Sequence, residues 1–310
     1  MKAQKYHALE QSSLFRMPTK RKLAELLGIT LSELRILSKS ENLYSHFPVP
    51  KKNGTMRIVD NPKAQLKRVQ KRIAKLLGRI SPPDALFCPV KGRSYVDNAR
   101  RHRHGRVVHS LDVKQYFPST TRRRVYWFFH TIMGCPEDVA ATLANLACCD
   151  GHLATGSPAS PILAYYAHVD VWRKVAALAK DAGCVLSIYI DDITMSGEHV
   201  PHELIWSVKR VIHGGGLRYH KEKRSVDRPC EITGVILKDG KLLAPNRQHR
   251  KLRDAKLAVA RNRNPRENAR VAGKLAGLRG QFGQIEKGNL IPLDALPTEA
   301  GQSGTGHGSI

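Results

Sequence analysis

The sequence predicts an α+β fold, in which short apolar strands share the chain with amphipathic helices. Residues 187–195 are mostly β-branched or aromatic apart from Asp191 and Asp192, which indicates a strand, a tight turn and a second strand. Residues 107–113 form another apolar run, which contains Asp112 near its end. Elsewhere, apolar residues recur at the 3.6-residue period of helices.

The paired acids need a positive partner, because like charges inside an apolar segment repel each other. If the strand that carries Asp112 lies beside the hairpin of Asp191 and Asp192, three carboxylates converge. Acidic clusters of this kind suit Mg²⁺, and two such ions clamp the attacking and leaving oxygens of phosphoryl transfer. The competing interpretation is a surface hairpin in which Asp191 and Asp192 only form the turn.

The charge balance predicts a polyanionic partner. The 310 residues include 52 Lys and Arg against 26 Asp and Glu, which gives a formal net charge of +26. This surplus is spread along the chain and favours nucleic acid over a membrane surface. No apolar run reaches the roughly 18 residues of a transmembrane helix, and the N-terminus has no apolar signal segment. We therefore expect a cytoplasmic protein without a membrane partner.

The cysteines and histidines show no pattern of a metal site. Six cysteines form no Cys-x-x-Cys pair, and the 14 histidines add no spacing typical of zinc ligands. Cysteine often behaves as a small apolar residue, so the sequence predicts free, mostly buried thiols. We expect no disulfides in the cytoplasm.

The N-terminal part predicts a pair of helices and a basic helix. Leucines recur at helical spacing over residues 22–37 and are interrupted at residues 28–30, which indicates helix, turn and helix. The same pattern can read DNA, but we interpret this pair as a packing element. Residues 61–62 begin a further helix that is apolar on one face and basic on the other.

Between these elements lies a predicted hairpin. Two strand-like runs over residues 47–59 flank the turn-forming pair Asn53-Gly54. The turn would present Lys51, Lys52 and Arg57 together, either as a solvated basic hairpin or as a phosphate-binding one. The residue pattern does not decide between Lys51 and Lys52.

The middle of the chain predicts a basic segment and more helices. Residues 91–106 are rich in Arg and His, and Asn98 and His102 would share one face of a helix. Residues 122–147 predict two helices that are separated near Pro136. Around residue 156 the chain passes from strand to helix, and the glycine there permits close approach of a base or sugar.

The C-terminal part predicts one more helix pair and a strand. We expect a helix through residue 180, a helix over 202–213 that ends at three glycines, and a strand over 230–237. Residues 247–287 predict two or three basic helices. The tail 291–310 is rich in Gly, Ser, Pro and Thr, and we expect it to be disordered.

Five motifs together resemble those of a known family. Asp112 with Tyr116-Phe117, the stretch 153–161 and Tyr189-Ile190-Asp191-Asp192 are similar in order and spacing to three motifs of reverse transcriptases. Asn98-Ala99-Arg100-Arg101-His102 and Ile232-Thr233-Gly234 resemble the Asn-Ala-x-x-His and Val-Thr-Gly signatures of retron reverse transcriptases. The resemblance covers residues from about 20 to about 290.

This resemblance implies a right-hand polymerase fold, with fingers, a palm built on an antiparallel sheet and a helical thumb. Fingers and palm would occupy residues 1–240, and the thumb residues 241–290. The implied activity is Mg²⁺-dependent, RNA-templated DNA synthesis by a nucleotidyltransferase. Its partners would be a cognate structured noncoding RNA, the RNA/DNA hybrid, dNTPs and a separate effector protein. The implied product is RNA-linked multicopy single-stranded DNA (msDNA), made in antiviral defence.

The resemblance also assigns roles to residues. It implies that Asp112, Asp191 and Asp192 are catalytic and bind two Mg²⁺ together with the backbone carbonyl of Val113. The implied nucleotide-binding residues are Lys52, Arg57, Tyr116, Phe117, Thr155, Gly156 and Lys223. Phe117 would exclude a 2′-hydroxyl. The implied RNA-binding residues are Asn98, His102, Thr233 and Gly234. Ala154 and Thr155 stand where the family usually has Pro and Gln, which puts their contacts in doubt.

Two rival hypotheses remain. The chain resembles, less closely, reverse transcriptases of group II intron or diversity-generating type, but it shows no long maturase or endonuclease extension. A structural RNA-binding protein that keeps a polymerase fold without activity is the rival from another class. The intact Asp112, Asp191 and Asp192 speak against that hypothesis.

Overall fold

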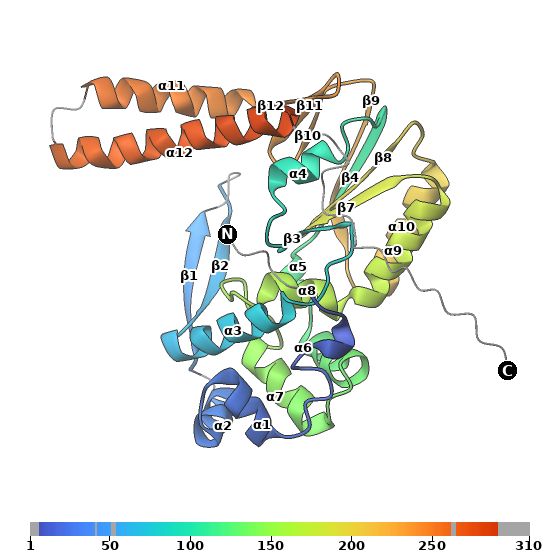
Figure 1. Cartoon of the computed structure of the whole chain (residues 1–310), viewed down its shortest axis with the longest axis vertical. Helices are drawn as coiled ribbons and strands as arrows, with labels where there is room; N and C mark the ends of the chain where they lie inside the picture. The colour runs from blue at the N-terminus through green and yellow to red at the C-terminus, as the bar shows by residue number, and fades with distance from the viewer. Residues whose placement is uncertain (1–5, 41, 51–53, 262–264, 291–310) are drawn as a thin grey trace.

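A computed structural model describes residues 6–40, 42–50, 54–261 and 265–290 (Figure 1). The strands are β1 (Tyr44–Pro50), β2 (Met56–Pro62), β3 (Leu86–Cys88), β4 (Val107–Val113), β5 (Cys148–Cys149), β6 (His152–Leu153), β7 (Val185–Tyr189), β8 (Asp192–Gly197), β9 (Tyr219–Val226), β10 (Cys230–Ile232), β11 (Val235–Lys238) and β12 (Lys241–Leu243). The α-helices are α1 (Lys20–Leu27), α2 (Leu31–Lys39), α3 (Ala64–Leu77), α4 (Tyr95–Arg100), α5 (Tyr116–Ser119), α6 (Arg122–Trp127), α7 (Glu137–Ala147), α8 (Ser160–Ala167), α9 (Val169–Asp181), α10 (His202–Gly214), α11 (Asn246–Arg261) and α12 (Pro265–Leu290). A 3₁₀ turn, η1 (Leu9–Gln11), precedes them, and a π-helical turn, η2 (Phe128–Ile132), follows α6.

A five-stranded sheet forms the centre of the molecule, in the order β3-β7-β8-β4-β9. The pairs β7–β8, β8–β4 and β4–β9 are antiparallel, whereas the short β3 pairs with β7 in parallel. The predicted α+β class with an antiparallel sheet is therefore confirmed, with one parallel strand added at its edge. Helices α9 and α10 lie beside each other next to β7 and β8 (Figure 1).

Two hydrophobic cores hold the chain together. The larger core runs from α1 through the central sheet to α10 and includes the fully buried Trp172. The smaller core joins Val96 of α4 and Val108 of β4 to the sheet β10-β11-β12 and to Ile285 of α12. This second core fixes the small sheet and the base of the α11–α12 hairpin, which projects from the body (Figure 1). Among the described helices, none is both long and apolar enough to span a bilayer.

The predicted N-terminal helix pair is confirmed. Gly28 ends α1 in the left-handed conformation, with φ of 73°, and Thr30 caps α2 reciprocally with Glu33. The predicted hairpin is also present, because β1 and β2 pair from Tyr44–Pro62 to Pro50–Met56. Its tip, with Lys51 and Lys52, lies outside the described residues. Helix α3 begins at Ala64, because residues 61–62 still belong to β2.

Two predicted elements are divided in the structure. The helix expected through residue 180 breaks at His168 into α8 and α9. The strand expected over 230–237 is a hairpin, since Thr233 and Gly234 have φ of 46° and 90° and turn β10 back onto β11. Two consecutive residues with positive φ are what a two-residue hairpin turn requires, and Thr-Gly supplies them without the usual Asn or Asp.

The C-terminal prediction of basic helices is confirmed by α11 and α12, which lie side by side (Figure 1). The boundary expected between residues 240 and 241 falls within the turn from β11 to β12, so β12 stays with the small sheet. The helical hairpin itself begins at Asn246. The tail 291–310 lies outside the described residues.

Gly156 packs against the backbone of β2. Its N–H donates to the carbonyl of Asp60 at 3.2 Å, and a Cβ at this position would lie 2.8 Å from that oxygen and 3.1 Å from Cα of Asn61. The sequence predicted close approach of a base or sugar to this glycine, whereas the group that lies against it in the structure is the backbone of the β1–β2 hairpin. This contact sets the distance between the hairpin and the loop before α8.

We predict that Gly156→Ala lowers the free energy of unfolding by about 1–3 kcal/mol, because backbone atoms would have to move to admit the methyl group. Urea unfolding measures the change. Gly273→Ala is the matched control: it lies within α12 with open space around its Cβ, and we expect it to stabilise by about 0.5–1 kcal/mol. Equal effects of the two substitutions would contradict the packing explanation.

Candidate active site

Three carboxylates meet at one edge of the central sheet. Asp112 near the end of β4 lies directly opposite Asp192, the first residue of β8. Asp191 forms the two-residue turn with Ile190, and its carbonyl accepts a hydrogen bond of 2.8 Å from the N–H of Val113. The convergence that the sequence predicted is therefore present. The sheet register produces it, because the pairing of β4 with β8 fixes which residues face each other.

The turn that carries Asp191 is strained. Ile190 has φ of 58°, in the left-handed region that β-branched side chains rarely adopt. Such outliers persist only where the surrounding structure holds them, and they concentrate at functional sites. Here the pairing of Tyr189 with Asp192 holds the turn in place.

The electrostatics of the three acids are unfavourable without a cation. Burial, together with the neighbouring Asp191 and Asp112, raises the pKa of Asp192 to about 6. Burial and Asp112 also raise the pKa of Asp191, against the effect of its own backbone N–H. A divalent cation would relieve this repulsion, and a set of carboxylate oxygens is the donor set that Mg²⁺ prefers. The residues present therefore fit a magnesium site.

Basic residues of β9 line the other side of these acids. Lys221 pairs in register with Asp112, with its Nζ 3.5 Å from Oδ2, and Nδ1 of His220 is 3.4 Å from Oδ1. Lys223, which the resemblance singled out, lies opposite Ser110 two residues further along. No sequence pattern singles out His220 or Lys221, since only the pairing of β9 with β4 brings them to the site.

A pocket of about 400 Å³ opens beside the carboxylates. It is lined by Asp112 and Asp192, by Lys221 and Lys223, and by the Thr233-Gly234 turn. Arg247 lies at the same pocket and forms an ion pair with Glu231 through two contacts of 2.5 and 2.6 Å. The pocket thus combines acids that can bind cations with bases that can bind phosphate.

The two aromatic residues after Asp112 have different environments. Tyr116 is buried, and its hydroxyl accepts a hydrogen bond of 3.1 Å from Nε1 of Trp172. Phe117 is only partly buried and stacks on Tyr116 with ring centroids 6.0 Å apart. Tyr116 therefore belongs to the core, whereas Phe117 keeps an exposed part next to the carboxylate strand. Of the two, Phe117 is the better candidate for substrate contact.

Thr155 and Gly156 contact the β1–β2 hairpin through Asp60. The N–H of Thr155 donates to Oδ2 of Asp60 at 3.3 Å, and the N–H of Asp60 donates to Oγ1 of Thr155 at 3.0 Å. These bonds hold the hairpin that carries the exposed Arg57. Lys52 lies outside the described residues. Thr155 and Gly156 thus position the hairpin in this conformation.

The implied RNA-binding residues divide into two groups. His102 is fully buried and bonds to the hydroxyls of Ser187 and Ser196, each at 2.7 Å. Asn98 is buried as well and donates to Oγ1 of Thr233 at 3.3 Å. Both side chains are buried in this conformation, and the RNA contact implied for Asn98 and His102 stays a prediction. His102 joins β7 to β8, whereas Asn98 joins α4 to the turn between β10 and β11.

Thr233 and Gly234 are placed differently, since both line the pocket beside Asp192. Asn98 anchors this turn through Thr233, whose hydroxyl also donates to the carbonyl of Tyr95 at 3.0 Å. The two family signatures, 135 residues apart in sequence, therefore contact each other. The sequence contained both, but only the fold relates them to the carboxylates.

Comparisons with known proteins agree with this geometry. No family model matches the chain. It is 32% identical over 250 residues to the retron Mx65 reverse transcriptase and 27% identical over 255 residues to the retron Mx162 reverse transcriptase, both of Myxococcus xanthus. These matches cover 71% and 69% of this chain. It is also 26% identical over 295 residues to the retron Se72 reverse transcriptase of Salmonella heidelberg, which covers 89% of this chain and 78% of that protein.

The two Myxococcus proteins are longer than this chain. The chain spans 58% of the Mx65 protein and 52% of the Mx162 protein. Among solved structures, a foamy viral protease-reverse transcriptase in complex with double-stranded DNA matches 80% of this chain and 38% of its own. Its TM-score is 0.46 at 14% identity, a likeness too distant to assign a fold by itself.

The raised pKa of Asp192 predicts how stability depends on pH. A folded-state pKa near 6, above the ordinary 3.8, means that protonation favours the folded state. This stabilisation is complete below pH 4 and is lost as the pH rises through 6. In a chelating buffer at pH 7.5, we expect Asp192→Asn to be more stable than the parent protein by about 1–2 kcal/mol. The difference should disappear below pH 4.

Urea unfolding at several pH values measures this difference, and added Mg²⁺ should stabilise the parent protein more than Asp192→Asn. A variant that is less stable than the parent at pH 7.5 would show that the carboxylates do not repel each other.

The burial of His102 predicts a structural role. Its pKa is lowered to about 3 by burial and by Arg101, so the ring is neutral and each nitrogen serves one serine. We expect His102→Ala to cost about 2–4 kcal/mol of unfolding free energy, because two buried hydroxyls lose their partner. His104→Ala, which removes an exposed histidine from the same segment, should change stability little. If His102→Ala instead weakens RNA binding at unchanged stability, the result would indicate that His102 contacts RNA.

Proposed function

We propose that this chain, a distant homologue of the retron reverse transcriptases, is an RNA-directed DNA polymerase. The observation that carries the proposal is the β4–β8 register, which sets Asp112 opposite Asp192 with Asp191 in the adjoining turn. Carboxylates on neighbouring strands beside a basic pocket are suited to nucleotidyl transfer, which depends on positioning and on neutralising phosphate charge.

Asp112, Asp191 and Asp192 would hold two Mg²⁺, with the backbone carbonyl of Val113 as a further ligand. When bound, these ions would supply Lewis-acid activation of the attacking hydroxyl and stabilise the charge on the transferred phosphate. The repulsion of Asp192 by Asp191 and Asp112 supports this role, because a bound cation would relieve it. A primer 3′-hydroxyl, or an RNA 2′-hydroxyl at initiation, would attack the α-phosphate, and pyrophosphate would leave.

Basic and aromatic residues around the acids would orient the nucleotide. Lys223 lines the pocket next to Asp192 and would neutralise phosphate oxygens, together with Lys221. Arg57 and a lysine of the β1–β2 hairpin, Lys51 or Lys52, would bind the triphosphate from the other side. The exposed part of Phe117 would exclude a 2′-hydroxyl by steric contact, which favours dNTPs over NTPs.

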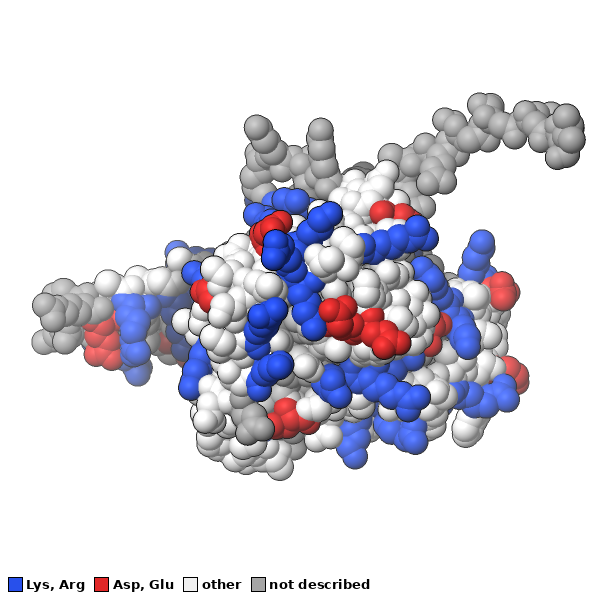
Figure 2. Space-filling view, turned by 90° about the horizontal axis from the view of Figure 1, so that it is seen from below, with Lys and Arg blue, Asp and Glu red and all other residues white. Residues whose placement is uncertain are grey.

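The remaining chain would hold the template and primer. We propose fingers and palm over residues 1–240 and a thumb of α11 and α12. The basic side chains of α11 would contact duplex phosphates: Arg247, Arg250, Lys251, Arg253 and Lys256. Lys and Arg also cover much of the face in Figure 2, where the acidic residues form only small groups. The Thr233-Gly234 turn would contact the nucleic acid near the carboxylates.

The names of the relatives support a finer proposal. As a retron reverse transcriptase, the protein would copy a cognate structured noncoding RNA and release msDNA that remains linked to RNA. It would act in the cytoplasm in antiviral defence with a separate effector protein. The relatives' names indicate the retron type and say nothing of the effector or the RNA.

Primer extension on poly(rA) with an oligo(dT) primer tests the activity. With dTTP and Mg²⁺ we expect extension by the parent protein and a loss of about 10³-fold in Asp191→Asn, because a metal ligand stabilises the transition state by several kcal/mol. Asp227→Asn is the matched control, since Asp227 is exposed and paired with Arg106 away from the site. We expect it to retain full activity.

Template binding without extension would overturn the polymerase proposal and favour the structural RNA-binding hypothesis. Equal losses in Asp191→Asn and Asp227→Asn would count against a specific role of the carboxylate cluster. If UTP is incorporated as readily as dTTP, the role proposed for Phe117 is wrong.

A further inference from the structure

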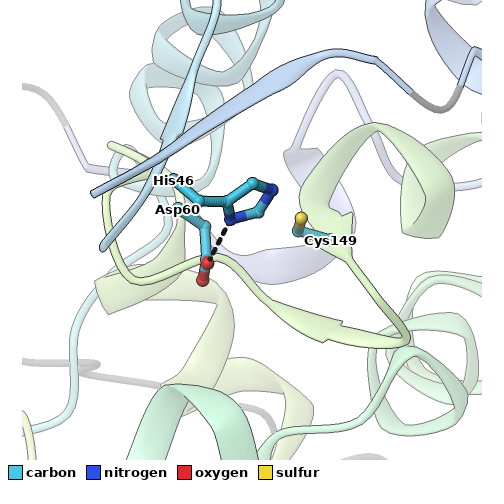
Figure 3. Close-up of side chains that lie close together, drawn as sticks. All are labelled: His46, Asp60 and Cys149. Atoms are coloured by element: carbon cyan, nitrogen blue, oxygen red, sulfur yellow. Dashed lines mark hydrogen bonds and ion pairs between the residues drawn. The ribbon is translucent and has the colours of Figure 1, made fainter. Parts of the chain in front are cut away.

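A second cluster of possible metal ligands lies away from the three acids. His46 of β1, Asp60 of β2 and Cys149 of β5 point toward one another (Figure 3). One potential ligand atom from each residue lies within 4.8 Å of the other two. Nδ1 of His46 is 3.1 Å from Oδ1 of Asp60. The sequence gives no sign of this cluster, because the three residues stand 14 and 89 positions apart.

The separations suit a tetrahedral ion. Ligand nitrogen and oxygen atoms about 2.0–2.1 Å from Zn²⁺ stand about 3.3 Å apart across a tetrahedral edge, and a sulfur at about 2.3 Å stands slightly farther from them. The observed 3.1 Å between His46 and Asp60 is close to such an edge. All three potential ligand atoms lie within 4.8 Å of one another, so a small rotation of the Cys149 side chain would bring its sulfur to the distance of a tetrahedral edge.

The surrounding structure already orients the carboxylate of Asp60. Its Oδ2 accepts a hydrogen bond of 3.3 Å from the N–H of Thr155, which leaves Oδ1 directed at His46. Ligating carboxylates in metal sites are held by similar second contacts. Asp60 and Cys149 are each only 7% exposed, whereas the side chain of His46 is 47% exposed. An ion could therefore reach the buried ligands past His46, where a water would complete the coordination.

We propose that His46, Asp60 and Cys149 bind a thiophilic divalent cation, with Zn²⁺ as the expected ion. The mixed nitrogen, oxygen and sulfur donors distinguish this site from the all-oxygen cluster of Asp112, Asp191 and Asp192, which suits Mg²⁺. Binding involves no electron transfer: the Cys149 thiol loses its proton to solvent as the metal–sulfur bond forms. The binding itself does not rest on the proposed polymerase activity.

The cation would alter the chemistry of Cys149. Burial, with the carboxylates of Asp150 and Asp60, raises the pKa of this thiol to about 12, so it remains protonated in their presence. A divalent cation reverses this balance by favouring the thiolate. Asp150, with Oδ2 3.6 Å from the sulfur, would then lie beside the ligand set and could accept a hydrogen bond from a metal-bound water.

The position of the site indicates its effect on the fold. It would join both strands of the β1–β2 hairpin to the β5–β6 hairpin, next to the contact between Asp60 and Thr155. The hairpin carries Arg57, and its base is also held by these hydrogen bonds, by the packing of Gly156 and by a hydrogen bond of 3.3 Å from the Tyr44 hydroxyl to the carbonyl of Cys148. A bound ion would fix the angle of the hairpin to the rest of the molecule.

Metal replacement tests the proposal on the purified full-length chain. After removal of bound metal with a chelator, Co²⁺ is added, and the near-ultraviolet charge-transfer band of a cobalt–thiolate bond is recorded. We expect one equivalent to produce the band in the parent protein, and Zn²⁺ to displace it. Cys149→Ser should lose the band. Cys148→Ser should keep it, because adjacent strand residues point to opposite faces.

Thermal unfolding provides a second measurement. Zn²⁺ should raise the melting temperature of the parent protein and of Cys148→Ser, and should not raise that of Cys149→Ser or of His46→Ala. His46→Ala changes only a half-exposed side chain, so we expect it to fold even where the buried substitution Cys149→Ser prevents folding. A parent protein without the band, or a band that survives Cys149→Ser, would overturn the proposal. In Asp191→Asn, which should lose primer extension, we expect the same cobalt–thiolate band and the same rise in melting temperature with Zn²⁺ as in the parent protein.

Discussion

The candidate active site depends on one constraint, the register between β4 and β8. The β4–β8 register sets Asp112 opposite Asp192, and a shift of this ladder by one residue would turn the apolar side chains of the strand away from the core. The buried residues Leu111 and Ile193, which also pair, hold that register. Packing of the sheet therefore offsets the repulsion between the carboxylates. A bound cation would relieve that repulsion and be held by the same carboxylates.

A second organising residue is Asp60. It connects the β1–β2 hairpin to the loop before α8 through Thr155, lies under Gly156, and faces His46 and Cys149. For the hairpin to contact a nucleotide as we propose, its base must be fixed, and Asp60 is at that base. The proposed nucleotide contact of Arg57 and the proposed zinc ligand Asp60 therefore lie on the same strand, β2.

Two sequence expectations meet tertiary contacts that the local pattern does not show. The resemblance implied RNA binding by Asn98 and His102, and in the structure both are buried, where His102 bonds to two serines and Asn98 anchors the Thr233 turn. Similarly, the strand expected over 230–237 is two strands, because Thr233 accepts a positive φ that its residue type does not announce. In this strand tertiary contacts outweighed a local preference.

The sequence by itself determined the elements whose signals are local: the N-terminal helix pair, the β1–β2 hairpin, a tight turn beside the paired acids, the basic C-terminal helices and the free cysteines. It also contained the motifs in which the chain resembles retron reverse transcriptases. Only the tertiary structure decided which distant residues meet, including Lys221 with Asp112, Asn98 with Thr233, and His46 with Asp60 and Cys149. The reason is physical: hairpins and helices form from neighbouring residues, whereas these contacts arise only when separate elements pack on a common core.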